Sequence, residues 1–141
     1  MKVGFTCSSF DLLHAGHILM LKDCKNHCDH LVIGLQTDPT IDRKDKNRPI
    51  QSLFERFIQL QAVSHIDEIC IYETEEQLKQ LIEYIKPDIR FIGVDWYGKE
   101  FTDCNSAKLK KYEMHYNPRY GYSTSKLRKD IYKAEKKRRN A

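Results

Sequence analysis

Short, nearly continuous runs of Val, Ile and Leu recur along this chain, and stretches with helical spacing separate them. Such apolar runs are typical of strands that are buried on both faces of a sheet. The expected strands lie at residues 2–7, 30–35, 68–72, 89–94 and 112–116. The alternation of strand and helix constrains the fold more than any other feature of the sequence.

Polar residues mark where several of the intervening helices begin. Two capping boxes, Ser52 with Glu55 and Thr74 with Gln77, each provide side chains that bond the free backbone N–H groups of a first turn. The expected helices are 16–26, one that starts after Ser52 and continues through Leu60, one that starts after Thr74 and ends near Pro87, and 123–133.

Strands that alternate with helices through right-handed crossovers form a parallel sheet that is covered on both faces. The sequence therefore predicts an α/β fold, a Rossmann-like three-layer sandwich with a five-stranded parallel sheet. In such sheets, ligands bind beyond the carboxyl ends of the strands, where the strand order changes direction. We expect the chemistry at the turn after the first strand.

The 141 residues, 40% of them hydrophobic, suit one domain over residues 1–132, followed by a basic tail over 133–141. The N-terminus has no basic segment before a long apolar stretch, and no run approaches the roughly 20 apolar residues of a membrane span. Five cysteines, an odd number, favour reduced thiols. We expect a cytoplasmic protein without a membrane span.

Two further features have a structural and a functional interpretation. Cys24, His27, Cys28 and His30 are of the ligand types that bind zinc, but one helix would have to break to converge them, so we expect no side-chain metal site. The formal net charge of +4 is concentrated in the basic tail, which either contacts an anionic partner or is a solvated, fraying helix end. We expect the second, without nucleic-acid binding.

The turn after the first expected strand carries the sequence His14-Ala-Gly16-His17 at a helix start. Neither glycine-rich phosphate motif is present, yet a helix N-terminus in this place favours an anion. The two histidines are three residues apart, so both rings can meet one phosphate chain, and Gly16 lets the backbone approach a ligand. The alternative is a pair of ordinary surface histidines.

At this point the chain resembles the H-x-G-H nucleotidyltransferase superfamily, and within it the short glycerol-3-phosphate cytidylyltransferases. The resemblance runs over nearly the whole chain, and its motifs occur in the family's order. The residues that carry it are 10–17 (FDLLHAGH), Thr37-Asp38, Lys44 and Lys46, Glu55-Arg56, Asp67-Glu68, Gly93 with Asp95-Trp96, Arg119, and 121–126 (GYSTSK).

The resemblance implies transfer of CMP from CTP to a phosphorylated small alcohol, with release of pyrophosphate, Mg²⁺ as cofactor and a homodimer. It implies that His14 and His17 bind the triphosphate and stabilise charge on the α-phosphate, while Lys44 and Lys46 close over the phosphates. The nucleotide-binding residues it implies are Ser9, Phe10, Asp11, Gly16, Asp95, Trp96, Arg119, Ser123, Thr124 and Ser125. Asp11 either serves the metal through water or fixes the turn by bonding backbone N–H groups, and we expect the second.

The sequence departs from the family pattern at positions that select substrates. Arg119-Tyr120-Gly121 lacks the family's threonine, which leaves the nucleobase open. Leu78 stands where the glycerol-phosphate enzymes have a lysine for the second substrate, which leaves the acceptor open. The alternatives are adenylyl transfer from ATP to a phosphorylated acceptor, and a nucleotide-binding module without turnover.

Overall fold

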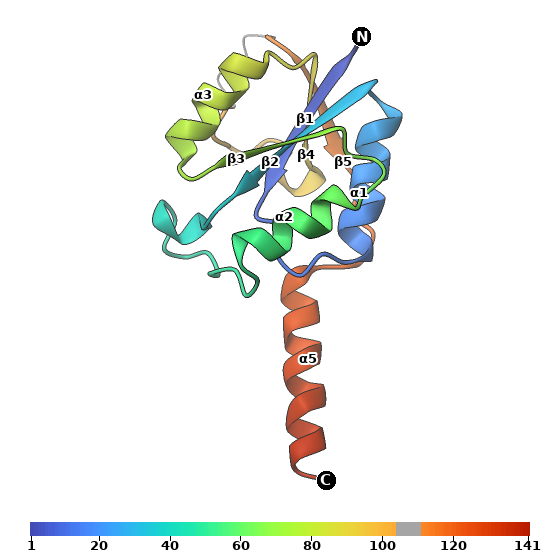
Figure 1. Ribbon diagram of the computed structural model, residues 1–141, viewed down its shortest axis with the longest axis vertical. Coiled ribbons are helices and arrows are strands. Elements are labelled where there is room, and N and C mark those ends of the chain that lie inside the picture. The colour runs from blue at the N-terminus through green and yellow to red at the C-terminus, as the bar shows by residue number, and fades with distance from the viewer. Residues whose placement is uncertain (104–110) are drawn as a thin grey trace.

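A five-stranded, all-parallel sheet forms the middle layer of the computed structural model, which describes residues 1–103 and 111–141 (Figure 1). The strands are β1 (Val3–Ser8), β2 (His30–Gln36), β3 (Glu68–Tyr72), β4 (Ile89–Gly93) and β5 (Glu113–Asn117). The α-helices are α1 (Ala15–Asn26), α2 (Leu53–Gln61), α3 (Glu75–Ile85) and α5 (Thr124–Arg139), and the short 3₁₀ helices are η1 (Pro39–Ile41) and η2 (Val94–Trp96). The predicted α/β fold is confirmed, and the ends of the expected strands move by at most about one residue.

The strand order is β3-β2-β1-β4-β5. The chain therefore winds outward from β1 through β2 to β3, and then crosses to the other side of β1 to form β4 and β5. The order changes direction between β1 and β4, so the turn that follows β1 lies where ligands bind in sheets of this kind.

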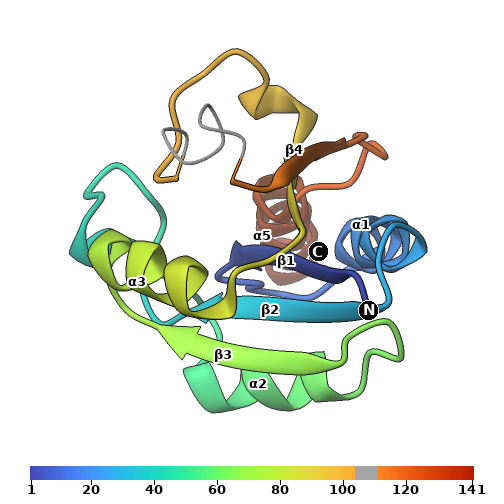
Figure 2. The same ribbon diagram turned by 90° about the horizontal axis from the view of Figure 1, so that it is seen from above.

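Two hydrophobic clusters cover the two faces of the sheet. On one face, α1 and α2 contribute Leu21 and Leu60, which pack with Leu31, Ile33 and Leu35 of β2. On the other face, Phe5 of β1, Val32 of β2 and Tyr72 of β3 pack with Leu78 and Ile82 of α3. Figure 2 shows α2 and α3 on opposite sides of the sheet. Successive residues of β2 thus serve opposite faces and are both buried, which explains its unbroken apolar sequence.

Both predicted capping boxes are present. Ser52 Oγ accepts from Glu55 N at the start of α2, and Thr74 Oγ1 accepts from Gln77 N at the start of α3. The helix α3 ends at Ile85, and the next residue, Lys86, adopts a left-handed conformation (φ 51°) before Pro87. These ends agree with the expectation from local sequence alone.

The last helix, α5, projects away from the body of the molecule (Figure 1) and continues to Arg139, six residues beyond the expected end at 133. Ion pairs at helical spacing support this extension, because the Glu135 carboxylate contacts both Arg138 and Arg139. The basic segment 133–141 is therefore mostly helical. Among the described residues, no helix is long and apolar enough to cross a membrane.

The described cysteines, Cys7, Cys24, Cys28 and Cys70, are free thiols, and Cys104 lies outside the described residues. Cys24 is buried within α1, whereas the His30 ring faces Glu68 of β3. Cys24 and His30, two of the four potential zinc ligands of the 24–30 segment, thus have different neighbours.

Candidate active site

The turn between β1 and α1 has an unusual backbone. Phe10 and Leu12 both have positive φ angles (49° and 51°), which residues with a Cβ rarely adopt. The Phe10 ring is fully buried against the core, and Leu12 N donates to Gln51 Oε1 at 2.9 Å. Strained conformations of this kind are frequent at functional sites, where the surrounding structure holds them in place.

The two histidines of the turn form a capping box of their own at the start of α1. His14 Nδ1 accepts from Gly16 N at 3.0 Å, and His17 Nδ1 accepts from His14 N at 3.2 Å. Their ring centroids are 4.0 Å apart. The structure thus brings both predicted residues together, and it also gives each ring a structural role.

The protonation of these rings follows from their hydrogen bonds and burial. Burial, with a smaller effect of the neighbouring His14, lowers the pKa of His17 to about 4, and burial also lowers the pKa of His14. Both imidazoles are therefore neutral at pH 7. Because each Nδ1 accepts a backbone N–H, the proton resides on Nε2. Each ring thus presents a neutral Nε2–H donor, and that of His14 lies within hydrogen-bond distance, 3.2 Å, of Thr124 Oγ1.

Gly16 lines the His14 side of the turn, and the structure also gives its missing side chain a packing role. A Cβ at this position would lie 2.8 Å from both His14 Cε1 and Tyr122 Cβ. The missing side chain therefore makes room for the His14 ring and for Tyr122, which precedes α5.

Two cavities meet at the turn. The first, called here the His14 cavity, has a volume of about 150 Å³ and is lined by His14, His17, Asn117, Arg119 and Thr124, among others. The second, the Lys46 cavity, has a volume of about 240 Å³, and its lining includes Ser9, Asp11, His17, Lys46 and Ser125. His17 and Thr124 line both.

The N-terminus of α5 closes the site from the other side of the turn. Ser123 caps this helix by accepting from Lys126 N, and Thr124 Oγ1 lies 3.2 Å from His14 Nε2. The predicted segment Ser123-Thr124-Ser125 therefore does adjoin the histidines. Two helix N-termini, of α1 and α5, converge on one place, and each favours negative charge.

Asp11 holds the turn to the rest of the fold. Its buried carboxylate accepts from Ile50 N at 2.8 Å and from Gln51 N at 2.9 Å, and Arg128 of α5 approaches it to 3.9 Å. These contacts agree with the expected structural role, although the backbone groups belong to segment 50–51 and not to the turn itself.

Arg56 has a similar positioning role. Its side chain is buried, and its guanidinium donates to the carbonyl oxygens of Ser9, Gln36 and Thr37. One arginine thereby joins the carboxyl ends of β1 and β2. The sequence offered only its place in the family pattern.

The two predicted lysines behave differently. Lys46 lines the Lys46 cavity and the larger pocket described below, whereas Lys44 is exposed and lines none of the cavities described here. Asp95 and Trp96, both in η2, lie at different sites. Asp95 pairs with Arg119, which lines the His14 cavity, whereas Trp96 lines the larger pocket.

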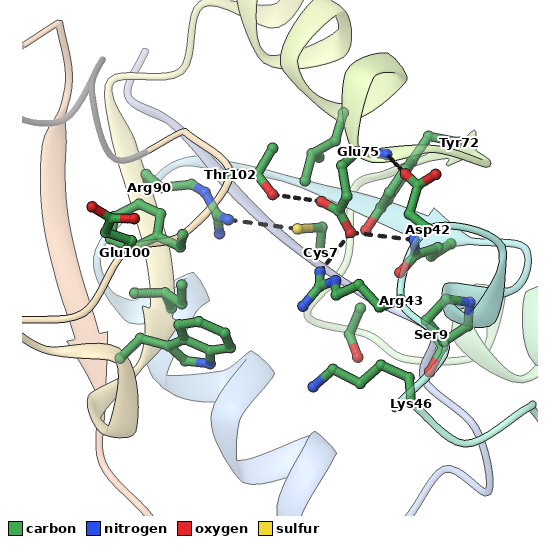
Figure 3. A pocket seen from close by; sticks show the side chains of 17 residues that line it. Cys7, Ser9, Asp42, Arg43, Lys46, Tyr72, Glu75, Arg90, Glu100 and Thr102 are labelled. Atoms are coloured by element: carbon green, nitrogen blue, oxygen red, sulfur yellow. Dashed lines mark hydrogen bonds and ion pairs between the residues drawn. The ribbon is translucent and has the colours of Figure 1, made fainter.

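The larger pocket, called here the Arg90 pocket, has a volume of about 760 Å³ and shares Ser8, Ser9, Pro39 and Lys46 with the Lys46 cavity. Figure 3 shows its polar side chains, which come from segments far apart in the sequence. Glu75 accepts from Arg43 and from Thr102 Oγ1. Burial raises the pKa of Glu75, but these hydrogen bonds outweigh it and hold the pKa below its usual value, so the carboxylate is anionic.

Arg90 was missed by the sequence reasoning. Its buried guanidinium pairs with Asp103, contacts Cys7 Sγ at 3.6 Å and lies over the Phe5 ring. Its charged residue type within an otherwise apolar strand was a signal, since buried arginines are rare unless they are paired.

Asn117 at the end of β5 was missed as well. Its side chain is 2% exposed, and Nδ2 donates to Asp23 Oδ2 at 2.9 Å. Within the described residues, Oδ1 has no hydrogen-bond partner, although the residue lines the His14 cavity. A buried acceptor without a partner is costly, so Asn117 Oδ1 is a candidate contact for a ligand.

An open parallel sheet with an H-x-G-H turn at its switch point defines a nucleotidyltransferase domain. The comparisons with known proteins agree with this class. Residues 5–130 match the model of the cytidylyltransferase-like family, and the chain belongs to that family.

The matches to curated relatives cover most of this chain but only a part of each relative. The bifunctional protein HldE of Helicobacter pylori (strain HPAG1) is 39% identical over 127 residues, which are 89% of this chain and 27% of the relative. HldE of Campylobacter jejuni (strain RM1221) is 35% identical over 130 residues, again 89% of this chain and 27% of the relative. The chain thus spans about a quarter of the length of these relatives.

Solved structures share the fold. A lipopolysaccharide core biosynthesis protein from Thermoplasma volcanium is 25% identical, with a TM-score of 0.66 over 87% of this chain and 99% of that one. A pantoate-beta-alanine ligase from Francisella tularensis, at 16% identity and a TM-score of 0.60 over 88% of this chain and 61% of that one, supports the fold alone.

Proposed function

We propose that this domain transfers CMP from CTP to the phosphate of a phosphorylated sugar or polyol and releases pyrophosphate. The observation that carries the proposal is the pair of neutral Nε2–H donors of His14 and His17, held between two helix N-termini. This arrangement suits a group that gains negative charge during reaction, because the donors are fixed before the charge develops.

The reaction needs positioning and electrostatic stabilisation more than covalent chemistry. A phosphate oxygen of the acceptor attacks the α-phosphorus of the nucleotide, and the bond from that phosphorus to the bridging oxygen breaks as pyrophosphate leaves. In this proposal His14 and His17 donate to the α-phosphate, Lys46 lies beside the phosphate chain, and the N-terminus of α5 with Ser123, Thr124 and Ser125 holds the leaving pyrophosphate.

Mg²⁺ is proposed as the cofactor, and the residues at the turn fit it in an indirect way. Each Asp11 carboxylate oxygen accepts one backbone N–H and keeps a further lone pair, which suits a water molecule of a hydrated ion. Mg²⁺ would be held mainly by the nucleotide's own phosphates, and its charge would neutralise the leaving pyrophosphate.

The Arg90 pocket is the proposed acceptor site. It opens onto the Lys46 cavity through shared residues, so a ligand there can place its phosphate next to the nucleotide. Its hydrogen-bonding side chains, including Glu75, Thr102 and Arg43, are of the kind that recognise several hydroxyl groups. The Thermoplasma volcanium neighbour, described as a lipopolysaccharide core biosynthesis protein, also favours a sugar phosphate.

The nucleobase is assigned to the His14 cavity. Asn117 lines this cavity, and its buried Oδ1 has no hydrogen-bond partner within the described chain. Cytosine carries an exocyclic amine, which can donate to such an acceptor once the side chain turns toward the base. Adenine carries such an amine too, whereas uracil does not. CTP is the proposed substrate, and ATP is the competing outcome of the test.

The test is pyrophosphate release with Mg²⁺ and each of CTP, ATP, GTP and UTP, against glycerol 3-phosphate and a panel of sugar phosphates. Release with CTP and a sugar or polyol phosphate, lost in His14→Ala, supports the proposal. Release only with ATP refutes the nucleotide assignment, and nucleotide binding without release under any acceptor favours a module without turnover. Sedimentation of the same sample tests the proposed homodimer.

A further inference from the structure

A second cluster of chemically capable side chains lies away from the H-x-G-H turn, between the last turns of α1 and the middle of β5. It consists of Asp23, His27 and His115, and each can present one ligand atom within 4.8 Å of the others. Of the 24–30 segment, only His27 belongs to it. We propose that these three residues form a binding site for a divalent transition-metal ion of the Zn²⁺ or Co²⁺ type.

The ligands come from two elements that pack side by side. Asp23 and His27 are four residues apart at the C-terminal end of α1 and therefore share a face of that helix. His115 belongs to the neighbouring β5, and its Nε2 lies 2.9 Å from Asp23 Oδ2. His115 and Asp23, almost a hundred positions apart in the chain, are thus in direct contact through the Asp23 carboxylate.

The distances are compatible with a metal ion after small side-chain rotations. Zinc bonds nitrogen and oxygen at about 2.0–2.2 Å, which places the ligand atoms of a tetrahedron about 3.4 Å apart. His27 Nδ1 lies 3.8 Å from Asp23 Oδ1 and donates to the Asp23 backbone carbonyl at 2.8 Å, a hydrogen bond that metal binding at Nδ1 would replace. The two imidazole rings have centroids 4.1 Å apart. The two rings therefore already lie next to each other and to the carboxylate.

The surroundings favour a cation. The site lies at the C-terminus of α1, where the helix dipole is negative. Asn117 Nδ2 donates to Asp23 Oδ2, an outer contact of the kind that orients carboxylate ligands in metal sites. Asp23 and His115 are half-buried and His27 is exposed, so the site combines a fixed carboxylate with access from solvent.

The chemical type of the ion follows from the ligands. Two imidazoles with one carboxylate suit zinc, cobalt or nickel, whereas Mg²⁺ and Ca²⁺ prefer oxygen ligands alone. Three protein ligands leave coordination positions for water. An ion here would tie α1 to β5, and α1 carries His14 and His17 at its other end.

The test is titration of the chelator-treated, metal-free chain with Co²⁺, followed through its visible absorption bands, and with Zn²⁺ in competition. We expect one high-affinity equivalent per chain. Since loss of an outer-shell partner costs about 10–100-fold in affinity, loss of a ligand in His27→Asn or His115→Asn should cost about 100-fold or more.

The matched control is His30→Asn. His30 also faces a carboxylate, with Nε2 3.1 Å from Glu68 Oε2, but it has no place in the cluster. This variant, and His14→Ala at the active-site turn, should bind Co²⁺ like the wild type. His27 is exposed, so His27→Asn should keep its circular dichroism spectrum even if His115→Asn is destabilised. The proposal is overturned if the wild type binds neither ion, or if folded His27→Asn binds as tightly as the wild type.

Discussion

Substitution of His17 by asparagine should separate its two roles. His17 Nδ1 caps α1 by accepting from His14 N, whereas Nε2–H points to the proposed phosphate position. The amide oxygen of asparagine occupies nearly the place of Nδ1 and can keep the cap, but no atom replaces Nε2. His17→Gln is the matched counterpart, because its amide nitrogen reaches the Nε2 position while the cap acceptor is lost.

The magnitudes follow from these contacts. Loss of one donor to charge that develops in the transition state costs about 2.7–4 kcal/mol, so His17→Asn should lower kcat by about 100- to 1,000-fold. Loss of a capping contact costs about 1 kcal/mol, so His17→Gln should lower the melting temperature by about 2–4 °C and lose less activity. His17→Ala should show both losses.

The assays are pyrophosphate release at saturating nucleotide and thermal unfolding followed by circular dichroism. The reasoning is refuted if His17→Asn retains wild-type kcat, or if it unfolds at a lower temperature than His17→Gln. Either result would mean that the ring does not divide its nitrogens between helix and ligand as described.

Three further predictions concern the same turn. Gly16→Ala should push the His14 ring aside and lower kcat/KM by about 100-fold in the same assay, since a 1 Å misplacement has this scale. Asp11→Asn replaces one acceptor oxygen by an amide NH₂ group, a donor that faces a backbone N–H of segment 50–51. Urea denaturation should therefore show a loss of about 1–3 kcal/mol in the free energy of unfolding. His17 has a pKa of about 4 in the folded chain and about 6.5 in the unfolded chain, so the unfolded chain binds more protons between these pH values. The free energy of unfolding should therefore fall by on the order of 3 kcal/mol as the pH drops from about 6.5 to 4. In urea titrations across this range, His17→Asn should show a weaker pH dependence.

For the polar stretch that holds the two lysines, the sequence predicted the residue types but not which side chains face the site. Lys44 and Lys46 belong to one polar stretch, yet only Lys46 faces the cavities, because the direction of each side chain depends on how the stretch is anchored. Asp11 and Gln51 provide that anchor, by bonding segment 50–51 and Leu12. These contacts span about 40 residues, and no local pattern reports them.

The sequence by itself determined the order of the elements, the parallel sheet and the position of the H-x-G-H turn at its switch point. These depend on short-range properties: apolar runs, helical spacing and capping residues act within one turn or one strand. The tertiary structure alone decided which distant side chains meet. Only the assembly of the sheet and the packing of α1 beside β5 bring together three pairs of side chains: Arg90 with Asp103, Asn117 with Asp23, and His27 with His115. Such contacts depend on packing between elements, which has no periodic signal in the sequence.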